Sequence, residues 1–176
     1  MRIVTSTIAR AGAGLGALML AAGAAQAQQA GQQPQFEPER LYVGAGATFN
    51  DMAETGTGNG FQVFAGYDLG WVANHVRFDA EVGFMSTGNM RVKPAHRPPA
   101  SIRDQGLWAN GVARIPVAER LDVVGRFGLD MGLDTGLMAG IGVGYRVDRG
   151  LVVRAEYVVR DDVDSYQINL VYRPQR

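Results

Sequence analysis

The sequence predicts an all-β fold, an eight-stranded antiparallel up-and-down barrel, and three observations lead to this expectation. Apolar and polar residues alternate almost without interruption between Arg40 and Arg173. The side chains of a strand point alternately to opposite faces, so this alternation gives each segment one apolar and one polar face. The alternation falls into eight segments, each of about the ~9–11 residues that a tilted membrane-spanning strand needs. Short and longer polar connections lie between the segments, as expected of a barrel with short turns at one end and longer loops at the other.

The last quarter of the chain shows the pattern most clearly. Residues 136–173 contain three strand-length segments joined by polar turns at 148–150 and 161–164. One face of each segment is apolar and uncharged, while the other carries glycine, arginine, glutamate and amides. Three such segments in succession predict an antiparallel meander. The eight expected strands are 41–49, 61–69, 76–84, 107–115, 121–129, 137–146, 151–159 and 165–172.

The connections sort by their position along the chain. Those after the second, fourth and sixth strands are short, and the one after the third, residues 88–104, is the longest. Residues 50–60 read as a loop by composition, and 70–75 as a shorter connection. An up-and-down barrel with the ends of its first and last strands on one side separates its connections in this way, with short periplasmic turns and longer external loops.

The amino-terminal region is expected to be a targeting segment. Arg2 and Arg10 supply positive charge before residues 11–24, which are small and apolar, and Ala25-Gln26-Ala27 fits a signal-peptidase site. Residues 1–27 are therefore predicted to be a signal peptide and residues 28–39, rich in glutamine and proline, a flexible leader. Residues 40–176 are predicted to form the barrel.

Composition excludes several classes of function. The chain has no cysteine, so it has no disulfide, thiolate metal site, cysteine nucleophile or acylated cysteine. Cleavage after Ala27 would remove two of the 17 basic residues and none of the 17 acidic ones, leaving a net charge of −2. That balance gives no reason to expect nucleic acid as a partner.

Two arrangements of the faces are open at this point. A membrane barrel would turn its apolar face to lipid and its polar face inward, whereas a soluble periplasmic barrel of the lipocalin type would enclose an apolar ligand. The polar face holds five acids and five arginines, which in a narrow lumen would form a neutral charge network that excludes a continuous water column. These ten residues are Asp68, Arg77, Asp79, Glu81, Arg114, Asp122, Arg126, Arg146, Arg154 and Glu156.

Two further features favour the membrane barrel. The only lysine of the chain, Lys93, is in a loop, and arginine is the better partner for buried carboxylates. Aromatic residues fall near the strand ends, where they would mark the two interfaces of a bilayer. One group is Tyr67, Tyr145 and Tyr172, and the other is Phe49, Phe61, Phe84 and Tyr166.

Catalysis is not expected. The two histidines are His75, in a predicted turn, and His96, in a loop where only Ser101 could approach it. A nucleophile–base pair or a metal site would need a closer grouping than this. The sequence thus predicts a non-enzymatic protein with no cofactor and no metal, and an enzyme acting on lipid ranks below both barrel alternatives.

The carboxy-terminal segments resemble a known family. Gly142-Val143-Gly144-Tyr145-Arg146-Val147-Asp148, the LVVRAEY run at 151–157 and Val171-Tyr172-Arg173 are similar to the OmpA/OmpX-like small outer-membrane β-barrels. The resemblance implies a Gram-negative outer-membrane location and a role in envelope integrity, adhesion or resistance to host defences. It also implies recognition of the last strand by the outer-membrane assembly machinery, although members commonly finish on an aromatic residue and here Arg173 follows Tyr172.

Two expectations concern single positions or groups. The basic residues of the long connection would meet the phosphates of lipopolysaccharide on the outer surface. They are Arg91, Lys93, Arg97 and Arg103. On the barrel wall, Ile141 is expected to face lipid and Gly142 the lumen, so serine at Gly142 should be tolerated better than arginine at Ile141.

Overall fold

The computed structural model describes residues 36–52, 56–88, 90–92, 100–102, 105–131, 135–160 and 163–174. The expected signal peptide and residues 28–35 of the expected leader lie outside this part of the chain. No helix in the described ranges is long and apolar enough to cross a membrane. The elements are η1 (Pro38–Arg40), β1 (Leu41–Met52), β2 (Gly56–Ala73), β3 (Val76–Ser86), β4 (Met90–Val92), β5 (Ala100–Ile102), β6 (Gln105–Ala118), β7 (Leu121–Met131), β8 (Thr135–Asp148), β9 (Leu151–Arg160) and β10 (Val163–Tyr172).

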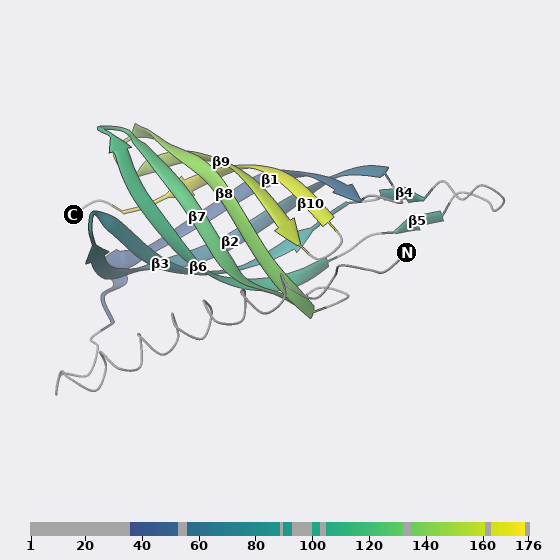
Figure 1. Ribbon diagram of the computed structural model, residues 1–176, viewed down its shortest axis with the longest axis horizontal. Helices are drawn as coiled ribbons and strands as arrows, with labels where there is room; N and C mark the ends of the chain where they lie inside the picture. The colour runs from purple at the N-terminus through teal and green to yellow at the C-terminus, as the bar shows by residue number, and fades with distance from the viewer. Residues whose placement is uncertain are drawn as a thin grey trace, which may run out of the picture. The chain divides into compact units, whose positions relative to one another are not determined.

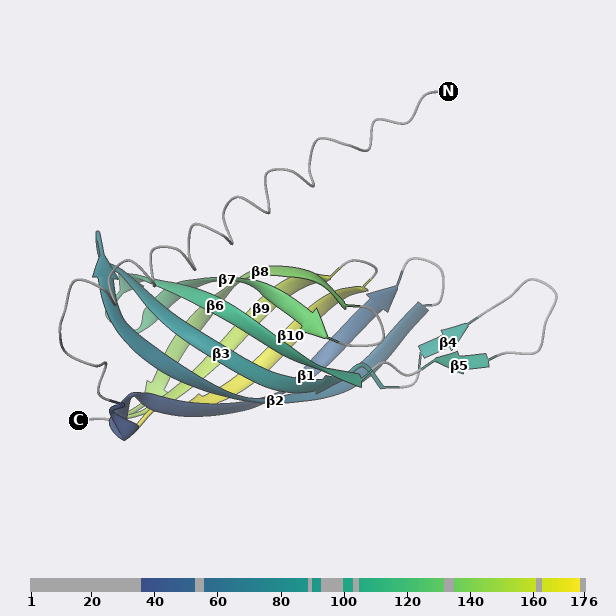
Figure 2. The same cartoon turned by 90° about the horizontal axis from the view of Figure 1, so that it is seen from below.

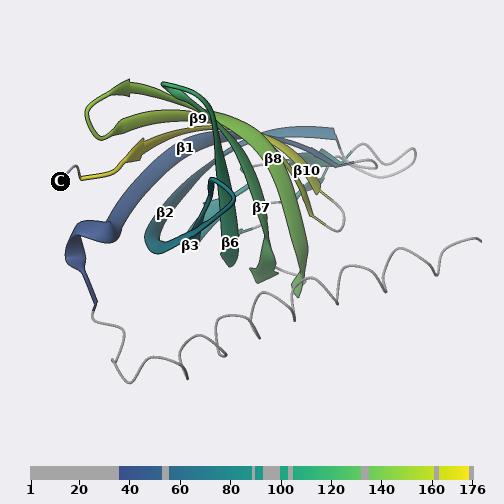
Figure 3. The ribbon, with the colours of Figure 1, turned by 60° about the vertical axis from the view of Figure 1, so that its left-hand side comes forward.

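Eight of these strands form one closed, antiparallel, up-and-down barrel in the order β1-β10-β9-β8-β7-β6-β3-β2 (Figure 1). The barrel closes where β1 pairs with β10, from Val43 opposite Tyr172 to Asp51 opposite Asp164 (Figure 3). Closure pairs every edge, which is the condition for strands to lie in lipid without exposed backbone polar groups. The expected fold class is therefore confirmed.

The two ends of the barrel differ. At one end, here called the turn end, β1 begins, β10 ends, and two-residue turns at 74–75, 119–120 and 149–150 join the hairpins. Asn74 and His75 both have positive φ, 49° and 70°, as the tightest hairpin turns require. At the opposite end, the loop end, β4 and β5 pair as a separate two-stranded extension beyond the barrel (Figure 2).

Several strands extend beyond their expected limits. The expected loop at 50–60 is wrong, because β1 continues to Met52 and β2 begins at Gly56. Asn50 pairs with Gly58 on one side and with Ser165 on the other, so neighbouring strands supply the backbone hydrogen bonds that composition alone does not reveal. The expected connection at 70–75 is likewise reduced to the turn Asn74-His75.

The apolar face points outward around the barrel. Val82, Ile141 and Ile168 have 59%, 63% and 54% of their surface exposed. Charged residues of the other face are buried, among them Glu81 at 1% and Arg154 at 2%. A soluble barrel with an apolar interior requires the opposite arrangement, so the lipocalin-like alternative is wrong.

The aromatic residues take the positions expected of interfacial girdles. Tyr145 and Tyr172 are exposed near the turn end, where Tyr145 pairs with Leu121 and Tyr172 with Leu151. Phe49 and Tyr166 are directly opposite each other nearer the loop end, and both are exposed. Rings at these two levels bound an apolar band, which is the surface that lipid-embedded barrels present.

Replacement of an outward-facing residue by arginine should oppose insertion. Ile141 is midway along β8 and faces outward, so Ile141→Arg should cost roughly 2–4 kcal/mol of folding free energy in a bilayer. Ile141→Leu is the matched control and should fold like the wild type. Urea titration of the barrel in lipid vesicles, followed by heat-modifiable gel mobility, measures the difference. Equal unfolding midpoints for the two variants would contradict the outward-facing assignment.

Candidate functional site

The lumen is shaped by aromatic rings that rest on glycines of neighbouring strands. A methyl group added at any of three luminal glycines would overlap the ring beside it, because no side chain separates the ring from the backbone. The pairs are Tyr42 on Gly66, Phe64 on Gly44 and Trp108 on Gly83. These rings, with Met85, Met138, Val158 and Val171, form the buried apolar part of the interior.

Glu81 is the centre of the charged part. Its carboxylate accepts hydrogen bonds from Arg154 at 2.7 and 3.2 Å, from Arg126 at 3.2 Å and from the Tyr42 hydroxyl at 2.7 Å. These side chains come from β3, β9, β7 and β1 respectively. A single carboxylate therefore links strands on different sides of the barrel.

Glu156 completes a four-membered ring of ion pairs. Its carboxylate is 3.0 Å from Nε of Arg126 and 2.7 Å from Nε of Arg154. Asn169 adds a hydrogen bond of 3.0 Å to the same carboxylate. The side chains of the four ring members, Glu81, Arg126, Arg154 and Glu156, are at most 3% exposed. Alternating charges at this burial offset the cost of desolvation that each would incur alone.

Asp79 forms a second cluster nearer the turn end. Arg114 binds it through two nitrogens at 2.7 and 2.8 Å, and Arg173 binds it at 2.7 Å. The second carboxylate of this cluster is Asp68, 3.2 Å from Arg114. Together the two clusters hold four carboxylates and four guanidinium groups, so the network is neutral.

The arginines also stack on the luminal rings. The guanidinium carbon of Arg126 is 5.3 Å from the centroid of Trp108, that of Arg154 is 5.0 Å from Phe64, and that of Arg173 is 3.6 Å from Tyr42. Such cation–π contacts stabilise a charge that has been removed from water.

Polar side chains continue the filling towards the loop end. The amide of Gln62 donates to Gln167 at 2.8 Å and to Asn169 at 2.6 Å. Beyond this amide layer, Ser165 donates to Asn50 at 2.6 Å. Arg160 forms an ion pair of 2.8 Å with Asp130. The interior is thus occupied over much of its length by hydrogen-bonded side chains.

The structure brings together seven of the ten residues expected in the luminal network. They are Asp68, Asp79, Glu81, Arg114, Arg126, Arg154 and Glu156. The other three, Arg77, Asp122 and Arg146, line a cavity at the turn end instead. They form no ion pair with any acid or base in the described part of the chain.

Sequence reasoning missed Tyr42, Arg173 and the pair of Asp130 with Arg160. Tyr42 is on the polar face of the expected strand 41–49, but it carries no charge that would have marked it as part of a charge network. Asp130, Arg160 and Arg173 continue the luminal parity of their strands one residue past the expected ends, where neighbouring strands extend the pairing.

Gly142 has less room than the expected tolerance of serine there requires. Gly142 faces the lumen, but a methyl group there would overlap the carbonyl oxygen of Ala155 and the side chain of Glu156. Serine therefore has no room without movement of the neighbouring backbone. Gly144, two residues further, meets only ordinary contacts with Val152 and Val124 and can accept a small side chain.

The side chains expected to contact lipopolysaccharide lie outside the described part of the structure. Arg91 belongs to β4, but its side chain lies outside the described part of the structure, as do Lys93, Arg97 and Arg103. His96 is outside it as well, and Ser101 is described only as part of β5. Among the described residues, no three histidine, cysteine, aspartate or glutamate side chains are grouped as a metal ion would require.

A closed barrel with an apolar, ring-bounded exterior and a charged, filled interior defines the class of small membrane-spanning β-barrels. The model of the family described as "Outer membrane protein beta-barrel domain" matches residues 15–173. The chain belongs to this family of outer-membrane proteins, and the resemblance to small outer-membrane barrels is confirmed.

Two solved structures of one protein share the fold at low sequence identity. The backbone structure of Yersinia pestis Ail in a phospholipid bilayer nanodisc is 14% identical, with a TM-score of 0.52, and the match covers 76% of this chain and 97% of that one. The crystal structure of Ail in complex with the heparin analogue sucrose octasulfate is 15% identical, with a TM-score of 0.50, over 75% of this chain and 96% of that one. Neisserial surface protein A is 17% identical, with a TM-score of 0.47, over 76% and 96%. No curated protein sequence matches the chain.

Removal of the central carboxylate should destabilise the barrel. Glu81→Gln keeps the volume but leaves the positive charges of Arg126 and Arg154 with one carboxylate fewer, which should cost about 3–5 kcal/mol. Asp122→Asn, a matched loss of one negative charge at a position without an ion pair, should change stability by less than about 0.5 kcal/mol. Urea unfolding in lipid vesicles compares the two. Similar effects from both substitutions would show that the central ring does not stabilise the fold.

Proposed function

We propose that this protein is a non-enzymatic structural component of the outer membrane, with a role in envelope integrity and a loop end that contacts partners at the cell surface. The observation that carries the proposal is the neutral, hydrogen-bonded filling of the lumen beneath an apolar exterior. Such a barrel neither transports through its centre nor encloses a substrate. It forms a stable body in lipid, with two ends exposed to water.

The filled lumen argues against a pore. The four-membered ring of Glu81, Arg126, Arg154 and Glu156 spans the interior at one level, and the amide layer around Gln62 and Gln167 occupies the next. Eight strands enclose a space that side chains can fill. A continuous water column is therefore not part of the proposal.

Planar-bilayer recording tests the absence of a pore. The wild-type barrel should produce no steady conductance steps, because mutual ion pairs hold the luminal side chains in place. Ile141→Leu, which alters only the outward face, should behave identically. Reproducible steps of a single size from the wild type would replace the structural role with that of a channel.

The non-enzymatic part of the proposal rests on the chemistry of the interior. Its carboxylates are bound by arginines, and neither Glu81 nor Glu156 is among the residues that line the cavity at the turn end. His75 belongs to a two-residue turn at the barrel end. Ion pairing leaves these acids with a structural role.

The proposed orientation places the turn end in the periplasm and the loop end outside. Outer-membrane barrels combine short periplasmic turns with longer external loops. The partners proposed on this basis are membrane lipid, lipopolysaccharide, the outer-membrane assembly machinery and an unidentified surface partner, but no nucleic acid. Export by residues 1–27 is part of the same proposal.

A surface role is supported by the extent of the loop end. β1 and β2 continue above the aromatic level, and β4 with β5 prolongs the connection between β3 and β6 away from the barrel. One structure of Ail, a barrel of the same fold, was determined in complex with a heparin analogue. The basic residues of connection 88–104 would similarly suit anionic sugars, with lipopolysaccharide as the proposed ligand.

A deletion strain tests the structural role. Loss of the protein should make cells more sensitive to detergents and to large antibiotics that an intact outer membrane excludes, and the wild-type gene should restore resistance. An Ile141→Arg gene, whose product should insert poorly, is the control that ties the effect to the assembled barrel. Unchanged sensitivity of the deletion strain would reject the role in envelope integrity.

Neutralising the long connection should separate surface contact from folding. Replacing Arg91, Lys93, Arg97 and Arg103 by glutamine should weaken lipopolysaccharide binding at low salt and reduce its salt dependence, since charge pairs with phosphate are screened by ions. Arg120→Gln with Arg149→Gln, two changes at the turn end, should leave binding unaltered. Binding by the purified barrels can be measured over a salt series. Equal affinities for the wild type and the neutralised protein would remove this connection from the proposed interface.

A further inference from the structure

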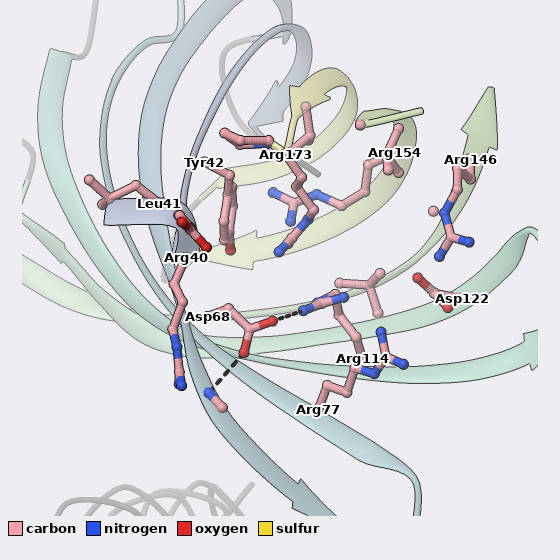
Figure 4. A pocket seen from close by; sticks show the side chains of 18 of the residues that line it. Arg40, Leu41, Tyr42, Asp68, Arg77, Arg114, Asp122, Arg146, Arg154 and Arg173 are labelled. Atoms are coloured by element: carbon pink, nitrogen blue, oxygen red, sulfur yellow. Dashed lines mark hydrogen bonds and ion pairs between the residues drawn. The ribbon is translucent and has the colours of Figure 1, made fainter. Parts of the chain in front are cut away.

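A water-accessible cavity of about 720 Å³ opens at the turn end of the barrel. Figure 4 shows its labelled side chains converging from several strands. Six arginines and three acids are among the described residues that line it. The arginines are Arg40, Arg77, Arg114, Arg146, Arg154 and Arg173.

Three of these arginines are already neutralised. Arg114 and Arg173 bind Asp79, and Arg154 binds Glu81 and Glu156. They belong to the neutral network described above and form the inner wall of the cavity. Arg40 has an interaction partner of its own. Two arginines, Arg77 and Arg146, remain.

Arg77 and Arg146 carry charges that the described part of the protein does not pair. Both side chains are exposed at the mouth of the cavity, and neither forms an ion pair with an acid in the described ranges. Asp122 is on β7, one of the two strands between theirs in the barrel order, and lies opposite Gly144 on β8. Its single negative charge can offset only one of the two positive charges.

The register adds a second observation. Arg77 on β3 is directly opposite Arg114 on β6, and like charges at opposed positions destabilise a sheet. Arg114 turns to Asp79 and Asp68, so its own charge is balanced, whereas Arg77 forms no ion pair with a described acid. A bound anion would relieve this unfavourable arrangement.

We propose that the turn-end cavity binds a phosphate group, through Arg77 and Arg146. Guanidinium groups present a planar fork of donors that matches phosphate oxygens. Six positive and three negative side chains line the cavity, and a concave wall with an excess of one sign concentrates ions of the opposite sign. The phosphate can belong to an anionic lipid headgroup or to a small soluble ligand, because both offer the same oxygens.

The position of the two arginines follows from the sequence. Arg77 comes one residue after the start of β3, and Arg146 comes two residues before the end of β8. Both have luminal parity at the turn end, so they face the cavity without entering the packed network. Between them, Gly144 and Val124 line the wall with small side chains and leave the cavity open.

Titration with pyrophosphate tests the proposal. The full barrel, in nanodiscs of zwitterionic phosphatidylcholine at low salt, is titrated by calorimetry. Arg77→Gln with Arg146→Gln should weaken pyrophosphate binding by roughly tenfold or more, since hydrogen bonds from charged groups are lost. The matched control is Arg120→Gln with Arg149→Gln, which removes two positive charges from turns at the same end without altering a residue that lines the cavity. Its affinity should stay within about twofold of the wild type because both side chains are exposed and do not line the cavity, so solvent ions screen their charges.

A substitution with the opposite sign strengthens the test. Asp122→Asn removes the acid that partly offsets the two arginines, so it should tighten pyrophosphate binding. Heat-modifiable gel mobility of each variant establishes that the barrel is folded. Absence of binding by the wild type, or an equal loss in the turn control, would overturn the proposal.

Lipid composition distinguishes the two sources of phosphate. Addition of phosphatidylglycerol to the nanodiscs should weaken pyrophosphate binding by the wild type if the headgroup reaches the same arginines. Unchanged affinity would assign the site to a soluble phosphorylated ligand. Either result is compatible with the proposed chemistry, and neither depends on the envelope or surface role.

Discussion

The burial of opposite charges at the centre of a narrow barrel is the constraint on which the rest of this structure depends. Glu81 and Glu156 could not be placed there without Arg126 and Arg154, because an unpaired charge in such a space would cost several kcal/mol. The four side chains come from three strands, β3, β7 and β9, and no two of these strands are neighbours in the barrel. The ring therefore connects strands that do not pair with each other, and it stabilises the closed barrel.

Space for this network comes from glycine. Large rings and guanidinium groups lie over the neighbouring strand where that strand has no side chain, as Tyr42 does at Gly66 and Arg126 at Gly140. The same device has a different result at the turn end. There Gly144 is near small valines rather than a ring, and a cavity remains. The distribution of glycines thus decides which part of the lumen is filled and which is open.

The outer face obeys a different constraint. Lipid requires apolar side chains and paired backbone groups. The outward-facing residues provide the first, and the closed order of eight strands provides the second. Membership of the outer-membrane barrel family and the fold of Ail agree with this arrangement. Fold and family do not specify a ligand, and the two ends of the barrel are free of the demands of the bilayer.

The sequence by itself determined the fold class, the strand periods and the side of each residue, because alternation along a strand is a local property. Parity placed Ile141 and Glu81 on opposite faces, and the single loop lysine and the aromatic residues at the strand ends favoured Ile141 as the outward one. The polar segments between the alternating runs indicated the short turns after the second, fourth and sixth barrel strands. Strand ends were less accessible: Asn50 and Arg160 extend their strands because neighbouring strands are there to pair with them.

Only the tertiary structure decided which charges meet. Arg114 binds Asp79 from 35 residues away and Arg154 binds Glu81 from 73 residues away, and the stagger of strands around a closed barrel sets these pairings. For the same reason, parity placed Arg77, Asp122 and Arg146 on the luminal face but could not show that they stand apart from the network. Whether a luminal charge is paired depends on its height along the barrel relative to strands distant in sequence, and closure fixes that height.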